Sequence, residues 1–179
     1  MEKIKIGDKF FKPFITAEQI DAAIQDVAKK MNEDLKDKNP LFICILNGAF
    51  MFAADLYRYI HIDSQITFMR MKSYEGMSST GSVKMISGLL EDVKDRNVVI
   101  VEDIIDTGYT MTGIIDQLKK QGAAEVYVST LLFKPEALKV EDLQIDYVAL
   151  EIPNAFIVGY GLDYDELGRN LKDIYVVAE

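Results

Sequence analysis

The spacing of apolar residues near the start of the chain predicts an amphipathic helix. Thr16-Ala17-Glu18-Gln19 has the pattern of a capping box, in which two side chains satisfy free backbone amides at a helix start. Apolar residues then recur at helical spacing, at Ile20, Ile24, Val27, Met31 and Leu35. This spacing places them on one helix face, and Asn39-Pro40 is typical of the turn that ends such a unit.

Two later stretches each predict a strand, a helix and a second strand. The first contains the apolar run Leu41–Leu46, a turn at Asn47-Gly48, a helix over 49–60 and a strand over 65–72. The second contains a strand over 97–101, a helix that carries Met111, Ile114, Ile115 and Leu118 and closes at Gln121-Gly122, and a strand over 126–133. Shorter strands are expected over 147–150, 156–158 and 174–177. Strands that alternate with helices predict an α/β fold with a largely parallel central sheet flanked by helices.

Composition and charge narrow the class of protein. The 179 residues suit one domain, and 49% of them are hydrophobic, which is enough for a substantial core. The formal net charge of −9 argues against a nucleic-acid partner, because duplex binding requires Lys and Arg to neutralise phosphates. Cys44 is the single cysteine, which excludes an intramolecular disulfide. The chain also has only one histidine, so a zinc site of Cys and His ligands is implausible. Since the chain shows no signal-peptide pattern and no apolar run of membrane-spanning length, we expect a cytoplasmic protein without membrane contact.

The clearest chemistry lies where the first strand of the second unit ends. The buried strand is followed by two adjacent carboxylates, Glu102 and Asp103, and a short loop then leads into a helix. In open α/β sheets, ligands bind beyond the carboxyl ends of the strands. Gly108 lets a phosphate approach the backbone, Thr107 and Thr110 can donate hydroxyl hydrogen bonds, and the free amides of a helix start favour an anion. The two carboxylates would then accept hydrogen bonds from ribose hydroxyls or hold a magnesium ion.

This segment, Glu102-Asp103-Ile104-Ile105-Asp106-Thr107-Gly108-x-Thr110, resembles the 5-phosphoribosyl diphosphate (PRPP) signature of the type I phosphoribosyltransferases. Within that family the chain is similar to the hypoxanthine–guanine phosphoribosyltransferases. Other segments agree in the same order over roughly residues 40–179: Leu46-Asn47-Gly48, Lys72-Ser73-Tyr74, Ser79-Thr80-Gly81, Lys134, Glu151-Ile152-Pro153, Val158-Gly159-Tyr160, Leu162-Asp163-Tyr164 and Arg169. The resemblance implies purine salvage, in which the phosphoribosyl group of PRPP passes to hypoxanthine or guanine and gives IMP or GMP and pyrophosphate.

The resemblance also implies roles for the residues of the signature. Asp106 would be the catalytic acid and base at N7 of the purine, because a carboxylate there can accept the proton that leaves as N9 attacks the sugar. Glu102 and Asp103 would hold the ribose hydroxyls, directly or through the cofactor Mg²⁺. The 5′-phosphate would lie in the loop of Thr107, Gly108, Tyr109 and Thr110.

A second set of residues is implied for the base. Phe156 would stack on the purine, with Ile104 on the opposite face. Lys134 would donate to the 6-oxo group, and adenine would be rejected because its amino group is a second donor facing a buried cation. The backbone near Ile157 and Asp163 would contact the rest of the base.

A third set is implied for the pyrophosphate. Asp163 is similar to a magnesium ligand of the family, and the planar guanidinium of Arg169 would hold two pyrophosphate oxygens. A loop over 73–82 resembles the family's closing flap, whose closure would exclude water. The remaining contacts would come from the backbone of Leu46, Asn47 and Gly48, in a turn where the family has a cis peptide, and from Ser73 and Tyr74.

Two positions depart from the family's pattern. Asn47 stands where the family often has Lys, and Tyr109 stands where some relatives have Lys. Both changes remove a charge and leave the backbone amides in place.

For the architecture, the resemblance implies a single phosphoribosyltransferase domain over residues 1–179. Its core would span about 38–150, and a small hood would be formed by the terminal segments at about 1–15 and 151–179. The implied partners are the small molecules PRPP, hypoxanthine and guanine, and the chain is expected to form a homodimer or homotetramer.

The sequence leaves other interpretations open. A non-catalytic regulator of the same fold, such as an RNA-binding attenuator, would keep the signature as a sensing site, although the charge of −9 argues against it. A transferase for xanthine, adenine or orotate is a further alternative; Lys134 disfavours adenine, and no residue settles xanthine. Phe156 as core packing, Lys134 as a surface lysine, Arg169 as an ion-pair partner and Asp163 as a turn residue are the plainer readings.

Overall fold

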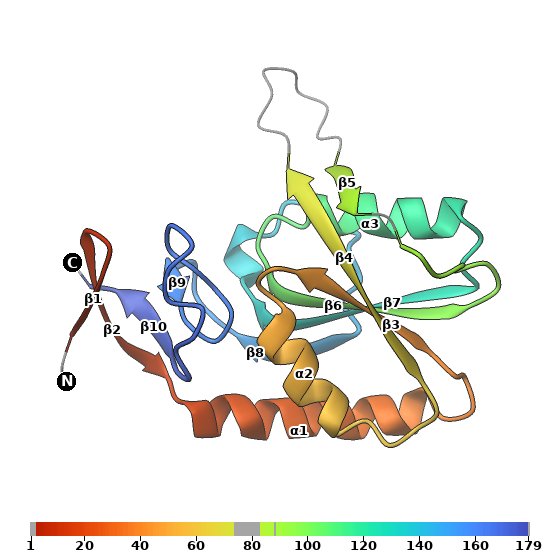
Figure 1. Ribbon diagram of the computed structural model, residues 1–179, viewed down its shortest axis with the longest axis horizontal. Helices are drawn as coiled ribbons and strands as arrows, with labels where there is room; N and C mark the ends of the chain where they lie inside the picture. The colour runs from red at the N-terminus through yellow and green to blue at the C-terminus, as the bar shows by residue number, and fades with distance from the viewer. Residues whose placement is uncertain (1–2, 74–82, 88, 179) are drawn as a thin grey trace.

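Two sheets organise the chain (Figure 1). The computed structural model describes residues 3–73, 83–87 and 89–178, with side chains described outside 72–88. The larger sheet runs in the order β5 (Val83–Ser87), β4 (Gln65–Ser73), β3 (Leu41–Leu46), β6 (Asn97–Ile105), β7 (Glu125–Phe133) and β8 (Tyr147–Glu151). Its strands are parallel from β4 to β8, and β5 is antiparallel to β4. The predicted α/β fold with a largely parallel sheet is confirmed.

Helices cover both faces of the larger sheet, which explains the continuous apolar run in β3. Side chains of one parity, such as Phe42 and Cys44, pack with α1 (Ala17–Asp34) and α2 (Phe50–Arg58). Side chains of the other parity, such as Ile43 and Ile45, pack with α3 (Tyr109–Lys120). Figure 1 shows α1 and α2 on one side of the sheet and α3 on the other. None of the helices in the described part of the chain is long and apolar enough to cross a membrane.

The predicted capping box is present at the start of α1. The amide of Gln19 donates to the Thr16 hydroxyl at 3.3 Å, and the amide of Thr16 donates to the Gln19 side chain at 2.9 Å. The two bonds satisfy free amides that the first helical turn leaves unpaired.

A smaller antiparallel sheet joins the two ends of the chain. Its order is β1 (Ile4–Ile6), β2 (Lys9–Ile15), β10 (Ile174–Val177) and β9 (Ile157–Val158). Phe11, which is fully buried, packs here with Ile6 and Val158. The hydrophobic pattern does not predict β1 and β2, because charged residues and Pro13 interrupt their apolar positions.

One predicted boundary is wrong where it matters for the site. The strand expected to end at residue 101 continues as β6 to Ile105, because its pairing with β7 goes on from Glu102↔Thr130 to Ile105↔Phe133. Glu102 and Asp103 therefore belong to the rigid strand, and the loop that leads to α3 begins at Asp106.

Candidate active site

A cleft of about 610 Å³ lies at the carboxyl end of β6 and is lined by residues between Glu102 and Met111. Gly108 caps α3 with a left-handed backbone, at φ 87°, and offers no side-chain acceptor to the amides of the first turn. A Cβ at this position would lie 3.0 Å from Leu143 and 3.1 Å from Leu138, on the packed side of the loop. The left-handed cap thus turns the helix start toward the cleft, where its free amides and dipole favour an anion.

Tyr109 departs from the rest of this loop. It is 58% exposed and is not among the residues that line the cleft, whereas Thr107 and Thr110 are. As the first residue of α3, it can present its backbone amide to an anion but not its side chain.

Two buried carboxylates border the cleft. Glu102 is 9% exposed, and its Oε1 accepts from the backbone amide of Asp103 at 3.0 Å. Burial raises the pKa of Glu102 well above its ordinary value, and the neighbouring Asp103 raises it further. Burial also raises the pKa of Asp103, although Arg169 and hydrogen bonds oppose the effect. The groups around the pair therefore do not offset the cost of burying two negative charges.

This donor set fits a magnesium ion. Mg²⁺ is usually held by one or two carboxylates together with water and substrate phosphate oxygens, and its charge would offset the burial of Glu102 and Asp103. Among the described residues no cluster of three potential metal ligands exists. Substrate and water would therefore have to complete the coordination.

The loop between β3 and α2 lies against one of these carboxylates, that of Asp103. A Cβ on Gly48 would overlap the carboxylate of Asp103, so a larger residue here would force that carboxylate to move. The Leu46–Asn47 peptide bond is cis, as the resemblance implies. Leu46, Asn47 and Gly48 are all partly exposed.

The residues predicted for the base converge on a second pocket of about 230 Å³. They come from β6 and β9 and from the loops after β6, β7, β8 and β9, and each was expected in the site from the sequence except Leu162. The lining consists of Asp103, Ile104, Asp106, Lys134, Phe156, Ile157, Leu162 and Asp163. Because Asp103 and Asp106 line both pockets, the two form one continuous site.

Lys134 and Asp106 form an ion pair inside this site. The Lys134 Nζ lies 3.0 Å from Oδ1 of Asp106. The lysine side chain is 10% exposed and that of the aspartate 48%, so a buried ammonium reaches a carboxylate that opens toward solvent. The reading of Lys134 as a surface lysine is wrong.

Phe156 presents an aromatic surface to the pocket and is not core packing. It is 47% exposed, and two aromatic rings pack against it. Tyr164 packs edge-on at a centroid distance of 5.7 Å, and the buried Phe11 of β2 lies at 6.2 Å. The Tyr164 hydroxyl donates to Asp8 in the turn between β1 and β2.

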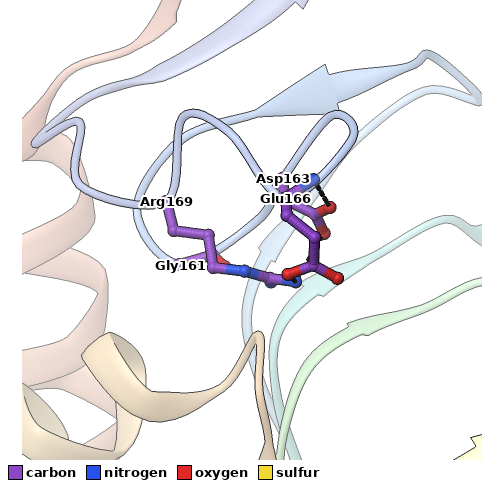
Figure 2. A network of polar contacts seen from close by, with 4 residues as sticks. All are labelled: Gly161, Asp163, Glu166 and Arg169. Atoms are coloured by element: carbon purple, nitrogen blue, oxygen red, sulfur yellow. Dashed lines mark hydrogen bonds and ion pairs between the residues drawn. The ribbon is translucent and has the colours of Figure 1, made fainter.

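Arg169 forms a network with two carboxylates, one of which, Asp163, lines the second pocket. Figure 2 shows its side chain extending across the loop toward Asp163 and Glu166. Nη2 lies 2.9 Å from Oδ1 of Asp163 and 3.1 Å from Oε2 of Glu166, and Nη1 donates to the carbonyl of Gly161 at 2.9 Å. The backbone amide of Glu166 donates to Oδ2 of Asp163 at 2.8 Å. Arg169 is therefore an ion-pair partner and Asp163 a turn residue, and both border the site.

Two predicted contacts remain untested by the geometry. Ser73 ends β4, but its side chain lies outside the described residues, as do Tyr74 and the rest of the predicted flap over 73–82.

Several residues that line or support the site have no role that the sequence predicts. Leu162 lines the second pocket, and Tyr164 and Phe11 pack against Phe156. The sequence offers one signal for Leu162 and Tyr164, because both are adjacent to Asp163, a residue that was expected in the site. Phe11 gives no such signal, because only the pairing of the terminal strands brings it near the site.

Comparisons with known proteins agree with the fold of the chain. The profile of the family described as "Phosphoribosyl transferase domain" matches residues 16–165. The hypoxanthine-guanine phosphoribosyltransferase of Streptococcus thermophilus strain CNRZ 1066 is 39% identical over 169 residues, which cover 94% of this chain and 93% of that protein. The hypoxanthine phosphoribosyltransferase of Buchnera aphidicola subsp. Schizaphis graminum is 41% identical over 91% of this chain and 93% of its own. A crystal structure of a hypoxanthine-guanine phosphoribosyltransferase from Bacillus anthracis superposes with a TM-score of 0.87 at 38% identity, covering 94% of this chain and 97% of that one.

Proposed function

The chain belongs to the phosphoribosyltransferase family, and from this premise we propose that it is an enzyme of purine salvage. It transfers the 5-phosphoribosyl group of PRPP to hypoxanthine or guanine, and it releases IMP or GMP together with pyrophosphate.

The observation that carries the choice of base is the 3.0 Å pair between Lys134 and Asp106. In a 6-oxopurine, the ring nitrogen N7 and the 6-oxo oxygen lie side by side on one edge. An ammonium beside a carboxylate matches this edge, because the oxo group accepts a hydrogen bond and N7–H donates one. Adenine presents an amino donor in place of the oxo group, and the buried ammonium would face it without an acceptor.

Asp106 is the group that moves the proton. As N9 of the base forms a bond to C1 of the ribose, the bond from C1 to the pyrophosphate oxygen breaks and the proton on N7 passes to the Asp106 carboxylate. The carboxylate is half exposed, so it can exchange that proton with water after product leaves. Lys134, held 3.0 Å away, orients the carboxylate before the base arrives.

The base is held between two apolar surfaces. Phe156, which packs against Tyr164, would stack on one face of the base, and Ile104 of β6, which lines the same pocket, would contact the other. A planar purine bound between them excludes water from C1 of the ribose, the carbon that N9 attacks.

The ribose phosphate lies along the cleft at the end of β6. The helix start at Gly108 binds the 5′-phosphate through backbone amides, with Thr107 and Thr110 as hydroxyl donors. Glu102 and Asp103 accept from the ribose hydroxyls or hold Mg²⁺, and Asp163 would be a further ligand. The bound magnesium ion would stabilise negative charge on the pyrophosphate as it departs.

Arg169 and the loop at Gly48 bind the pyrophosphate. The guanidinium donates to Glu166, whose side chain is 75% exposed. Exposed ion pairs of this kind contribute roughly 0–1 kcal/mol, so a pyrophosphate oxygen can displace Glu166 at low cost. Asn47 lacks the charge of the Lys common in the family, and the loop therefore acts through its backbone amides. Ser73 and Tyr74 would close over the leaving group from the flap.

The assay for this function is the release of pyrophosphate from PRPP and Mg²⁺ with each base in turn. We expect turnover with hypoxanthine and guanine and little with adenine. Absence of turnover with both 6-oxopurines would overturn the proposal, and a titration with xanthine tests that further base.

The same proposal extends to architecture and assembly. The smaller sheet, formed by segments within 1–15 and 151–179, acts as the hood of a single domain whose core spans about 38–150. The enzyme works in the cytoplasm as a homodimer or homotetramer, and light scattering of the purified protein tests the assembly.

A further inference from the structure

The segment Gly159-Tyr160-Gly161 has no role in the transfer described above, yet its backbone is unusual. All three residues have positive φ, at 108°, 49° and 97°. A Cβ on Gly159 would overlap the carbonyl of Asp173, and one on Gly161 would overlap the carbonyl of Gly48. Tyr160 has a side chain in a backbone region that non-glycine residues rarely adopt, so that side chain must contribute enough to offset the cost.

Tyr160 connects this segment to α2. Its side chain is only 7% exposed, and its hydroxyl donates to Oδ2 of Asp55 at 2.5 Å. Burial, together with this bond, raises the pKa of Tyr160, so the hydroxyl remains a donor. Asp55 lies in α2, which begins directly after the loop at Asn47 and Gly48 and is bonded to it through the amide of Phe50.

The other side of the segment holds Arg169. The Gly161 amide donates to the carbonyl of Arg169 at 2.9 Å, and the Arg169 guanidinium donates to the carbonyl of Gly161 at 2.9 Å (Figure 2). Gly161 also lies against the carbonyl of Gly48. The segment therefore lies between the two groups that would bind a pyrophosphate, which are the loop at Gly48 and the guanidinium of Arg169.

We propose that Tyr160 and Asp55 are positioning residues for the pyrophosphate site. Their hydrogen bond joins α2 to the Gly159–Gly161 segment and so keeps the backbone of Gly48 and the guanidinium of Arg169 at a constant separation. Neither residue touches the reacting atoms. A site formed before its ligand arrives binds more tightly, because less ordering is needed on binding. This inference rests on the proposed phosphoribosyl transfer.

The test is the Tyr160→Phe variant, which removes only the hydroxyl. Calorimetric titrations in the presence of Mg²⁺ measure the Kd of pyrophosphate and, separately, the Kd of IMP, which occupies the base and phosphate pockets but not the pyrophosphate site. We expect the pyrophosphate Kd to rise by about tenfold and the KM for PRPP to rise with it, while the Kd of IMP changes by less than about twofold. A residue that only stabilised the fold would lower Tm without this difference between the two ligands.

Two comparisons isolate the hydrogen bond. Tyr59→Phe removes a bond of the same kind one turn further along, at the carboxyl end of α2, where the Tyr59 hydroxyl donates to Oδ1 of Asp21 at 2.8 Å and not to the Gly159–Gly161 segment. It should leave the pyrophosphate Kd unchanged. Asp55→Asn keeps an acceptor oxygen and should bind pyrophosphate better than Asp55→Ala does.

The outcomes separate this inference from the proposed function. Wild-type pyrophosphate affinity in Tyr160→Phe, or an equal loss of pyrophosphate and IMP affinity, overturns the positioning role even if the wild type turns over hypoxanthine. A wild type that releases no pyrophosphate with either 6-oxopurine overturns the function itself.

Discussion

Replacing Lys134 with Met is the sharpest perturbation of base recognition in this structure. The variant removes the ammonium that lies 3.0 Å from Asp106. It keeps an unbranched side chain at a position where the lysine side chain is only 10% exposed. Asp106 loses its partner, but because its side chain is 48% exposed, water can solvate the carboxylate. We therefore expect the free energy of unfolding to change by less than about 1 kcal/mol, the usual range for pairs that reach solvent.

The expected effect on catalysis is larger than the effect on stability. A hydrogen bond from a charged donor contributes roughly 1.5–3 kcal/mol. Loss of the Lys134 bond to the 6-oxo group should therefore lower kcat/KM for hypoxanthine and guanine by about 10- to 150-fold. Adenine makes no such bond, so its kcat/KM should hold or rise, and the preference for 6-oxopurines should narrow by at least the same factor.

Steady-state rates of pyrophosphate release with hypoxanthine, guanine and adenine measure this change. The control is Lys120→Met, which removes a positive charge from the exposed end of α3. The Kd of PRPP should match the wild type in both variants. A Lys134→Met enzyme that keeps its rate with hypoxanthine within about threefold, or that rejects adenine as strongly as before, would refute the assignment of Lys134 to the 6-oxo group.

Three further predictions concern two carboxylates of the site and the buried cysteine of β3. Asp106→Asn should lower kcat by about 10²- to 10⁴-fold while PRPP still binds, and an unchanged rate would remove Asp106 from proton transfer. Burial raises the pKa of Glu102, so the folded state holds the Glu102 proton more tightly than the unfolded chain does. The stability that protonated Glu102 contributes is complete below pH 4.5, its ordinary pKa, and is lost as the pH rises through the folded pKa. Glu102→Gln should therefore raise the Tm of the metal-free protein at pH 8 and reduce the gain in Tm from added Mg²⁺, and a lower Tm would contradict the role of burial. Burial also raises the pKa of the Cys44 thiol to about 12, so the native protein should resist iodoacetamide at pH 8 and react only when unfolded.

The central secondary structure follows from local patterns. The run Leu41–Leu46 is a strand with the predicted bounds, and the capping box at Thr16 starts α1. Both features are encoded within a few residues, where burial on two faces or a capping hydrogen bond leaves a direct trace in the residue types. The end of β6 was misplaced because polar residues such as Glu102 usually mark a strand end, whereas here pairing with β7 continues through them.

The sugar-phosphate half of the site is local in the same way. Strand end, carboxylates, glycine cap and helix start all fall within one short segment, so their order along the chain predicts their arrangement at the cleft. The base half draws its residues from four separate places in the chain, and their roles came from the family resemblance.

By itself, the sequence determined the parallel α/β core, the phosphate-binding segment and the family to which they belong. Only the tertiary structure decided that the Lys134 ammonium meets the Asp106 carboxylate, that Phe11 supports Phe156, and that Tyr160 joins the loop beside Arg169 to α2. The physical reason is one of distance along the chain. Periodicity and capping record interactions between near neighbours, while contacts between remote segments depend on how the two sheets and their loops pack, which no local spacing specifies.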